Sequence, residues 1–273
     1  MAVEHAQQTG PAPGEIHPPR SALVRRLAAL AALLLCVLFA GLGTWQVMRL
    51  QWKLDLIERV DARVHAVPVA PPQVAQWPQV SREADEYRAV RVSGRYLYDL
   101  TTPVQALSEL GAGFWLLTPF CTVEGHIIFI NRGFIASSGD IATRYPGRTA
   151  PANACTSANA GADPVTLSGL LRIPELKGAF LRDNDPQQNR WYARDVVMLG
   201  AARGLPASAV APYFIDAAKN QNATGAPDQP VGGLTVISFP NNHLVYALTW
   251  YALALMVAAA WWWAARYSAR ATD

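Results

Sequence analysis

The stretch NHLVYALTWYALA, residues 242–254, decides the fold of this chain. It opens an uncharged apolar run that lasts from Leu244 to Ala265. A run of about 20 apolar residues is long enough to cross the hydrocarbon core of a membrane as a helix. The histidine of this stretch, His243, stands at the point where such a helix would meet water.

A second uncharged apolar run, from Leu27 to Met48, lies near the N-terminus. Because a membrane core offers no water to backbone polar groups, both runs are predicted to be helices. The first run is too long for the apolar region of a cleaved signal peptide, and no Ala-x-Ala site follows it. We therefore expect an uncleaved anchor, in agreement with the slightly positive mean hydropathy of +0.11.

Basic residues on the terminal sides of the two runs predict the orientation in the membrane. Cytoplasmic flanks of membrane helices are enriched in lysine and arginine. Such residues precede the first run and follow the second: Arg20, Arg25, Arg26, Arg266 and Arg270. Arg49 and Lys53 oppose this orientation, but the middle part is longer than the loops over which the charge rule operates. We expect a multi-pass protein of the bacterial inner membrane, with both termini in the cytoplasm and a periplasmic middle domain.

Composition and periodicity predict the following division of the chain. The expected parts are a disordered cytoplasmic tail over 1–26, a transmembrane helix over 27–48 that continues as helix to about 65, an external domain over 66–240, a second transmembrane helix over 243–265, and a cytoplasmic tail over 266–273. The tail prediction rests on the Pro- and Gly-rich composition of the first 19 residues.

The middle domain has the pattern of short strands. Residues 114–120 and 126–135 flank a Glu124-Gly125 turn and form the clearest hairpin. Further strands are predicted over 89–98, 104–107, 165–171 and 213–216, with Gly94 marking a bulge or a close backbone approach. The remaining predictions are a loop over 137–163, a helix over 191–202 stopped by Gly204, and a mobile linker over 220–233. The expected fold is α+β, with an antiparallel sheet curled into a partial barrel.

Several function classes are excluded by what the sequence lacks. The net charge of +3 is too small to indicate nucleic-acid binding. No nucleophile, phosphate-loop or metal-ligand motif occurs, so we do not expect an enzyme. The three cysteines are too few and too scattered for a zinc site. An oxidising compartment would permit a disulfide between Cys121 and Cys155.

His243 has two interpretations. It can simply lie among lipid headgroups, as polar residues at the ends of membrane helices commonly do. Ionisable residues near a membrane are also functional candidates, and an imidazole with apolar aromatic neighbours is typical of an axial haem site. The neighbours expected here are Trp45, Tyr246 and Trp250. For Gly94, Arg132-Gly133 and residues 191–195, a structural role is favoured.

A set of short motifs in a fixed order resembles the surfeit-locus-one (Shy) family of cytochrome c oxidase assembly proteins. The motifs are LGTWQ (42–46) with Arg49 and Trp52-Lys53, Tyr87-Arg88, VSGRY (92–96), GFWLLTPF (113–120), NRGF (131–134), WYARD (191–195), and His243-Leu244 through Thr249-Trp250-Tyr251. Together they extend over residues 30 to 265. The ordered set, bracketed by two spans, carries the resemblance.

The resemblance implies a two-span assembly factor that binds haem a and aids its insertion into subunit I of the oxidase. It places the proposed haem ligand of the family, and so the iron ligand, on His243. We further expect Trp45 and Gln46 to contact the ring or its propionates and Arg49 to pair with a propionate. Expected partners are subunit I, haem a synthase and membrane lipid, but no nucleic acid. Two alternatives are a haem-free scaffold that holds an oxidase assembly intermediate, and a membrane-anchored enzyme or sensor.

Overall fold

The structure is a computed structural model that describes residues 22–137, 141–160, 163–174, 182–221, 226–235, 239 and 241–270. The chain forms two compact units. One comprises the chain up to Asp55 together with the chain from Pro240 onward, and its described residues are mostly helical. The other is the domain Leu56–Phe239, which contains the sheet.

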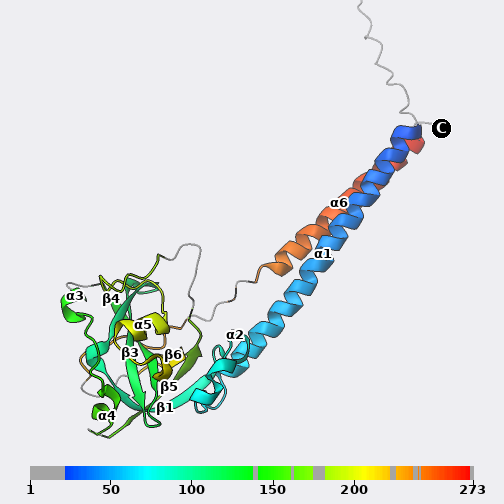
Figure 1. The fold of residues 1–273 in the computed structure, drawn as a ribbon. Coiled ribbons are helices and arrows are strands. Elements are labelled where there is room, and N and C mark those ends of the chain that lie inside the picture. The colour runs from blue at the N-terminus through cyan, green and yellow to red at the C-terminus, as the bar shows by residue number, and fades with distance from the viewer. Residues whose placement is uncertain are drawn as a thin grey trace, which may run out of the picture. The chain divides into compact units, whose positions relative to one another are not determined.

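Two long helices provide the apolar spans (Figure 1). They are α1 (Ala22–Val64) and α6 (His243–Arg270), and both are long and apolar enough to cross a membrane. Only 6% of the apolar window of each helix is buried within the protein. A core helix of a soluble protein would be mostly covered by its own chain, so this exposure favours helices that face lipid.

The ends of these helices differ from the prediction. Residues 22–26, predicted as part of the tail, are helical, and α6 extends to Arg270, beyond the predicted end at 265. Arginine is a good helix former, so Arg25 and Arg26 end the apolar run without ending the helix. The remaining tail residues, 1–21 and 271–273, lie outside the described residues.

The two helices pack antiparallel through small residues and a few polar contacts. Cys36 Sγ donates to the carbonyl oxygen of Ala254 at 3.5 Å, and Thr44 Oγ1 lies 3.0 Å from the hydroxyl of Tyr251. The residue numbers of the contacts fall along α6 as they rise along α1, so the two helices run antiparallel. A Cβ at Gly43 would lie 2.8 Å from the Tyr251 ring. The missing side chain therefore lets the ring lie against α1, as small residues do between membrane helices.

Six strands form the sheet in the described part of the second unit. They are β1 (Ala89–Tyr96), β2 (Thr102–Ser108), β3 (Gly111–Thr122), β4 (Ile127–Ala136), β5 (Val165–Arg172) and β6 (Val210–Ala217). The strand order is β1-β5-β6-β4-β3-β2, and β1 also pairs with β3. That extra pairing closes five strands into a ring. Strand β2 pairs with residues 111–117 of β3, on the same edge of β3 that β1 uses at residues 120–122. The predicted hairpin is β3–β4, and the predicted α+β fold with two bracketing helices and a partial barrel is confirmed.

Closure of the ring depends on Gly94. At this residue β1 pairs with both Val165 of β5 and Thr122 of β3. A Cβ at Gly94 would collide with the backbone of Cys121. Of the two roles expected for this glycine, the structure therefore shows the close backbone approach.

One strand pair departs from the antiparallel prediction. Strands β4 and β6 are parallel. The chain between them passes through β5 and α5 (Val196–Ala202) before it returns as β6, and such a long crossover permits a parallel pair. Helix α5 packs on β6 (Figure 1).

Consecutive residues of β4 face opposite sides of the sheet, and both sides are buried. Phe129 belongs to a cluster with Trp191, Val196 and Leu199. Ile128 and Ile130 belong to a second cluster, with residues of β1, β5 and β6. Burial on both faces explains why this segment reads as a continuous apolar run.

Three of the predicted irregular or helical segments are wrong in part. The predicted loop 137–163 contains α3 (Ile141–Arg144) and α4 (Ala154–Asn159). Helix α5 begins only at Val196, because the Asp195 side chain accepts hydrogen bonds from the backbone N–H groups of residues 197 and 198 and so caps the helix. The predicted linker 220–233 holds the buried Asp228, which accepts hydrogen bonds from Arg144 and Tyr145.

Four shorter helices complete the described fold: η1 (Val74–Gln79), α2 (Arg82–Asp85), η2 (Tyr98–Leu100) and η3 (Ala207–Ala209). A disulfide joins Cys121 of β3 to Cys155 of α4. Cys121 is fully buried and Cys155 packs against the same core cluster. The bond therefore fastens the segment after β4 to the sheet.

Candidate functional site

His243 is the first residue of α6 and contacts α1 through one edge of its ring. Its Nδ1 lies 2.8 Å from Oε1 of Gln46. Both side chains are partly buried. The imidazole therefore lies at the margin of the helix pair, with one nitrogen held against α1.

The other ring nitrogen is available. Within the described part of the chain, Nε2 of His243 has no hydrogen-bond partner. A neutral imidazole with one nitrogen hydrogen-bonded and the other bearing a lone pair is the donor arrangement of a metal-ligating histidine. His243 therefore fits the role of an iron ligand, with Nε2 as the atom that would bind the iron.

The predicted aromatic neighbours do not form a closed pocket. Trp45 is 50% exposed and Tyr246 is 54% exposed, so both present their rings outward. Trp250 stacks on Phe39 of α1 at 5.7 Å between ring centroids. In an α-helix, seven residues span about 10 Å along the axis, so Trp250 lies well below His243 on a similar face of α6.

Arg49 also points away from the helix interface. It is exposed, and its guanidinium lies 4.7 Å from the ring centroid of Trp52. Of the predicted residues, the structure brings together His243 and Gln46. Trp45 is exposed on α1 and Tyr246 is exposed on α6, whereas Trp250 packs between the two helices against Phe39.

Sequence reasoning missed the polar contact between Thr44 and Tyr251. The signal was present, because Thr44 lies within the LGTWQ motif and Tyr251 lies two turns after His243. Periodicity alone does not say which residues of two helices meet.

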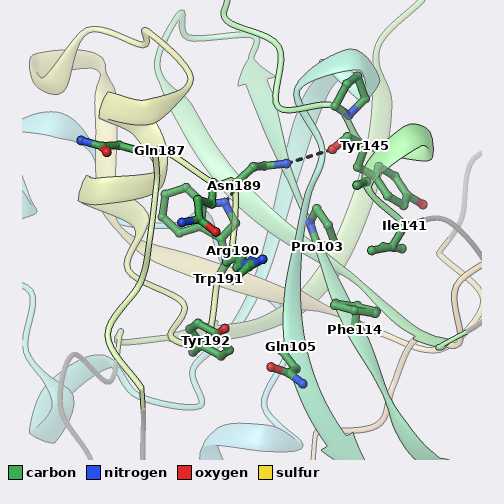
Figure 2. Close-up of a pocket in the computed structure, with 13 residues that line it drawn as sticks. Pro103, Gln105, Phe114, Ile141, Tyr145, Gln187, Asn189, Arg190, Trp191 and Tyr192 are labelled. Atoms are coloured by element: carbon green, nitrogen blue, oxygen red, sulfur yellow. Dashed lines mark hydrogen bonds between the residues drawn. The ribbon is translucent and has the colours of Figure 1, made fainter.

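The sheet domain contains a separate pocket of about 570 Å³ (Figure 2). Gln105 of β2 and Phe114 of β3 line one side, and Trp191 and Tyr192 line the other. The Asn189 side chain donates to the backbone carbonyl of Tyr145 at 2.9 Å, as the dashed line in Figure 2 shows.

Hydrogen bonds to the fold occupy the side-chain amide of Asn189 and the hydroxyl of Tyr145 in this pocket. Asn189 Oδ1 accepts from Trp191 Nε1 at 2.9 Å and from Arg203 at 2.7 Å. Burial, followed by the hydrogen bond to Asp228, raises the pKa of the Tyr145 hydroxyl above its ordinary value, so this hydroxyl stays a neutral donor. These contacts support the structural role favoured for residues 191–195.

A smaller and more polar pocket, of about 330 Å³, lies over a buried ion-pair network. Arg172 donates to Glu86 and to Asp216, each at 2.9 Å. Asp216 also accepts from Asn131 and Thr235. Its carboxylate oxygens are thus both engaged, which indicates a structural network.

Gly133 has a φ of +132° against the backbone of residue 231, and this backbone conformation favours glycine.

No group of three or more His, Cys, Asp or Glu side chains that could hold a metal ion occurs within the described ranges. The pair formed by His243 and Gln46 is therefore the candidate site that the structure best supports.

Two membrane-length helices that bracket a disulfide-linked partial barrel define a membrane protein with one sheet domain outside its spans. Comparison with known proteins identifies the group. The model of the SURF1 family matches residues 33–255. Surfeit locus protein 1 of Homo sapiens is 34% identical over 247 residues, which cover 84% of this chain and 74% of the human protein. The chain belongs to the SURF1 family.

Other relatives give the same result. Surfeit locus protein 1 of Mus musculus is 32% identical over 81% of this chain and 70% of the mouse protein. A SURF1-like protein of Monosiga brevicollis is 33% identical over 81% of each chain. These three relatives are eukaryotic.

Proposed function

We propose that this protein is an assembly factor for the haem–copper cytochrome c oxidase, and that it binds haem a and delivers it to subunit I. Membership in the SURF1 family supports the role in oxidase assembly. The observation that supports haem binding is the half-buried His243, whose Nδ1 is held by Gln46 and whose Nε2 is free within the described residues.

The site suits a ligand that is held and then released. The imidazole of His243, on an open face of the helix pair, would hold the iron without enclosing the porphyrin. Haem a carries a long apolar tail, which can remain in lipid beside the helices. We expect Trp45 and Tyr246, whose rings are about half exposed, to contact the porphyrin, and Arg49, exposed on α1, to pair with a propionate.

We place the sheet domain in the periplasm of a bacterium, with both termini in the cytoplasm. Two observations support this orientation. Basic residues flank the terminal sides of both spans. The disulfide between Cys121 and Cys155 joins two segments of the domain, and disulfides persist in oxidising compartments. In this orientation His243 lies at the periplasmic end of α6, and the sheet domain is available to contact subunit I and haem a synthase.

The test is an absorption spectrum of the full chain, purified in detergent after co-expression with haem a synthase. The wild-type protein should carry the bands of a bound haem, and His243→Ala should lose them. His65→Ala is the matched control, because His65 directly follows α1, is highly exposed and pairs with Asp61 of that helix. It should keep the spectrum.

Two results would oppose the proposal in different ways. Full retention of haem with an unchanged spectrum in His243→Ala would remove His243 from the site. A colourless wild-type protein, obtained although haem a is made, would favour the haem-free scaffold that stabilises an assembly intermediate.

A further inference from the structure

Gln46 lies beside the candidate ligand, but it holds the imidazole instead of facing outward. The sequence suggested that this side chain would touch the porphyrin or its propionates. In the structure its Oε1 lies 2.8 Å from His243 Nδ1. The side chain is partly buried between α1 and α6, so its carbonyl oxygen is committed to the histidine.

The chemistry of this contact determines which ring nitrogen carries the proton. A carboxamide oxygen only accepts hydrogen bonds. With the carboxamide oriented as in the structure, Nδ1–H of His243 is the donor, and in the neutral ring Nε2 is then left with its lone pair. The tautomer selected by Gln46 is the one that can ligate iron through Nε2.

The neighbouring contacts make the pair rigid. Thr44, two residues before Gln46, is within hydrogen-bond distance of Tyr251. Gly43 leaves room for the ring of Tyr251 against α1. Both contacts are between the same two helices as the pair of Gln46 and His243, so the helices are fixed next to the site.

We propose that Gln46 is a positioning residue that fixes the orientation and tautomer of His243 and strengthens it as an iron ligand. This inference rests on the proposed haem function. Hydrogen-bond acceptors behind a ligating histidine set its orientation and increase its basicity. Loss of such an acceptor typically lowers metal affinity about 10- to 100-fold.

The first experiment reads the tautomer without haem. Nitrogen NMR of the full chain, labelled with ¹⁵N-histidine in detergent at about pH 8, where an ordinary histidine is neutral, distinguishes protonated from bare ring nitrogens. His243→Ala identifies the signals of His243 among the five histidines. The wild type should show a protonated Nδ1 and a bare Nε2, and Gln46→Leu should lose this preference.

The second experiment uses the chain loaded with haem a by co-expression with its synthase. Gln46→Leu should weaken haem retention about 10- to 100-fold. Gln46→Glu keeps an acceptor, so it should retain haem and lower the midpoint potential of the iron. Gln51→Leu is the matched control, since Gln51 is an exposed glutamine of α1, and it should behave as wild type.

The outcomes separate this inference from the proposed function. If the wild type binds haem and His243→Ala loses it, but Gln46→Leu keeps the wild-type tautomer, affinity and potential, the role of Gln46 is refuted and the haem site stands. If the wild type takes up no haem, the haem function fails and the ligand-positioning role fails with it, whatever the NMR shows. Rescue by Gln46→Glu after failure of Gln46→Leu supports the inference, because packing alone does not move the potential.

Discussion

The disulfide between Cys121 and Cys155 should contribute a large part of the stability of the sheet domain. The two cysteines are 34 residues apart in the sequence. In the chain-entropy description, a cross-link over such a loop removes about 13 cal/mol/K from the unfolded chain, or about 4 kcal/mol at 25 °C. For a domain of this size, 1 kcal/mol corresponds to about 2–4 °C in Tm. The double variant Cys121→Ala/Cys155→Ala should therefore unfold about 8–16 °C below the wild type.

The assay is a thermal scan of the purified full chain in detergent, followed by circular dichroism of the sheet. Cys36→Ala is the control, because Cys36 is the free cysteine and lies in the apolar part of α1. Its Tm should stay near that of the wild type. A double variant within about 2 °C of the wild type would refute the reasoning. So would rapid labelling of Cys121 and Cys155 by a maleimide in unfolded, unreduced protein, since it would show that the bond does not form.

Three further predictions concern the helix pair and the sheet domain. Gly43→Leu should separate the helices and speed the labelling of Cys36 by an apolar maleimide. Gly41→Leu is the control and should not, because a side chain at Gly41 meets open space. Equal labelling rates in the two variants would contradict the packing. Arg172→Leu removes the buried cation between Glu86 and Asp216 and leaves these carboxylates only their longer ion pairs with Arg82 and Arg194. The domain should be destabilised by up to about 3–5 kcal/mol, seen as a lower Tm, and an unchanged Tm would count against the network. Burial lowers the pKa of His126 below its ordinary 6.5, so the unfolded state binds its proton first as the pH falls. The stability that the neutral His126 contributes to the folded state is therefore present above about pH 6.5 and lost as the pH falls below it. A pH series of Tm should show this loss in the wild type but not in His126→Phe.

The large-scale organisation could be predicted because it depends on local patterns. The two uncharged runs predict α1 and α6 by length and hydropathy alone. The β3–β4 hairpin follows from two apolar strands around the turn at Gly125, whose φ of +92° suits glycine. Each of these features is written within a few consecutive residues.

Other features depend on partners that are distant in sequence. The parallel pairing of β4 with β6 is decided by the route of the chain through β5 and α5, which periodicity does not encode. Helix α5 begins at Val196, later than the predicted start at Trp191. In the structure Trp191 is buried in the core, and Asp195 caps the helix. Asp228 lies in a sequence typical of a linker but is buried by its partners.

The candidate site was predicted in part. The position of His243 at the end of an apolar span makes it a candidate, and the family resemblance places the proposed haem ligand on it. Its contact with Gln46 could not be assigned, since that contact requires the relative rotation of two helices whose residues are 197 positions apart in the chain. The same rotation turns Trp45 and Tyr246 outward and Trp250 toward Phe39.

Chemical rescue tests most directly whether the imidazole of His243 is the iron ligand. His243→Gly, co-expressed with haem a synthase, removes the ring and leaves Gln46 with room for a free imidazole of the same shape. Added imidazole should restore the haem spectrum of the wild type, and in Gln46→Leu/His243→Gly the rescue should need about 10- to 100-fold more imidazole. A His243→Gly protein that carries wild-type haem before any imidazole is added would contradict the account.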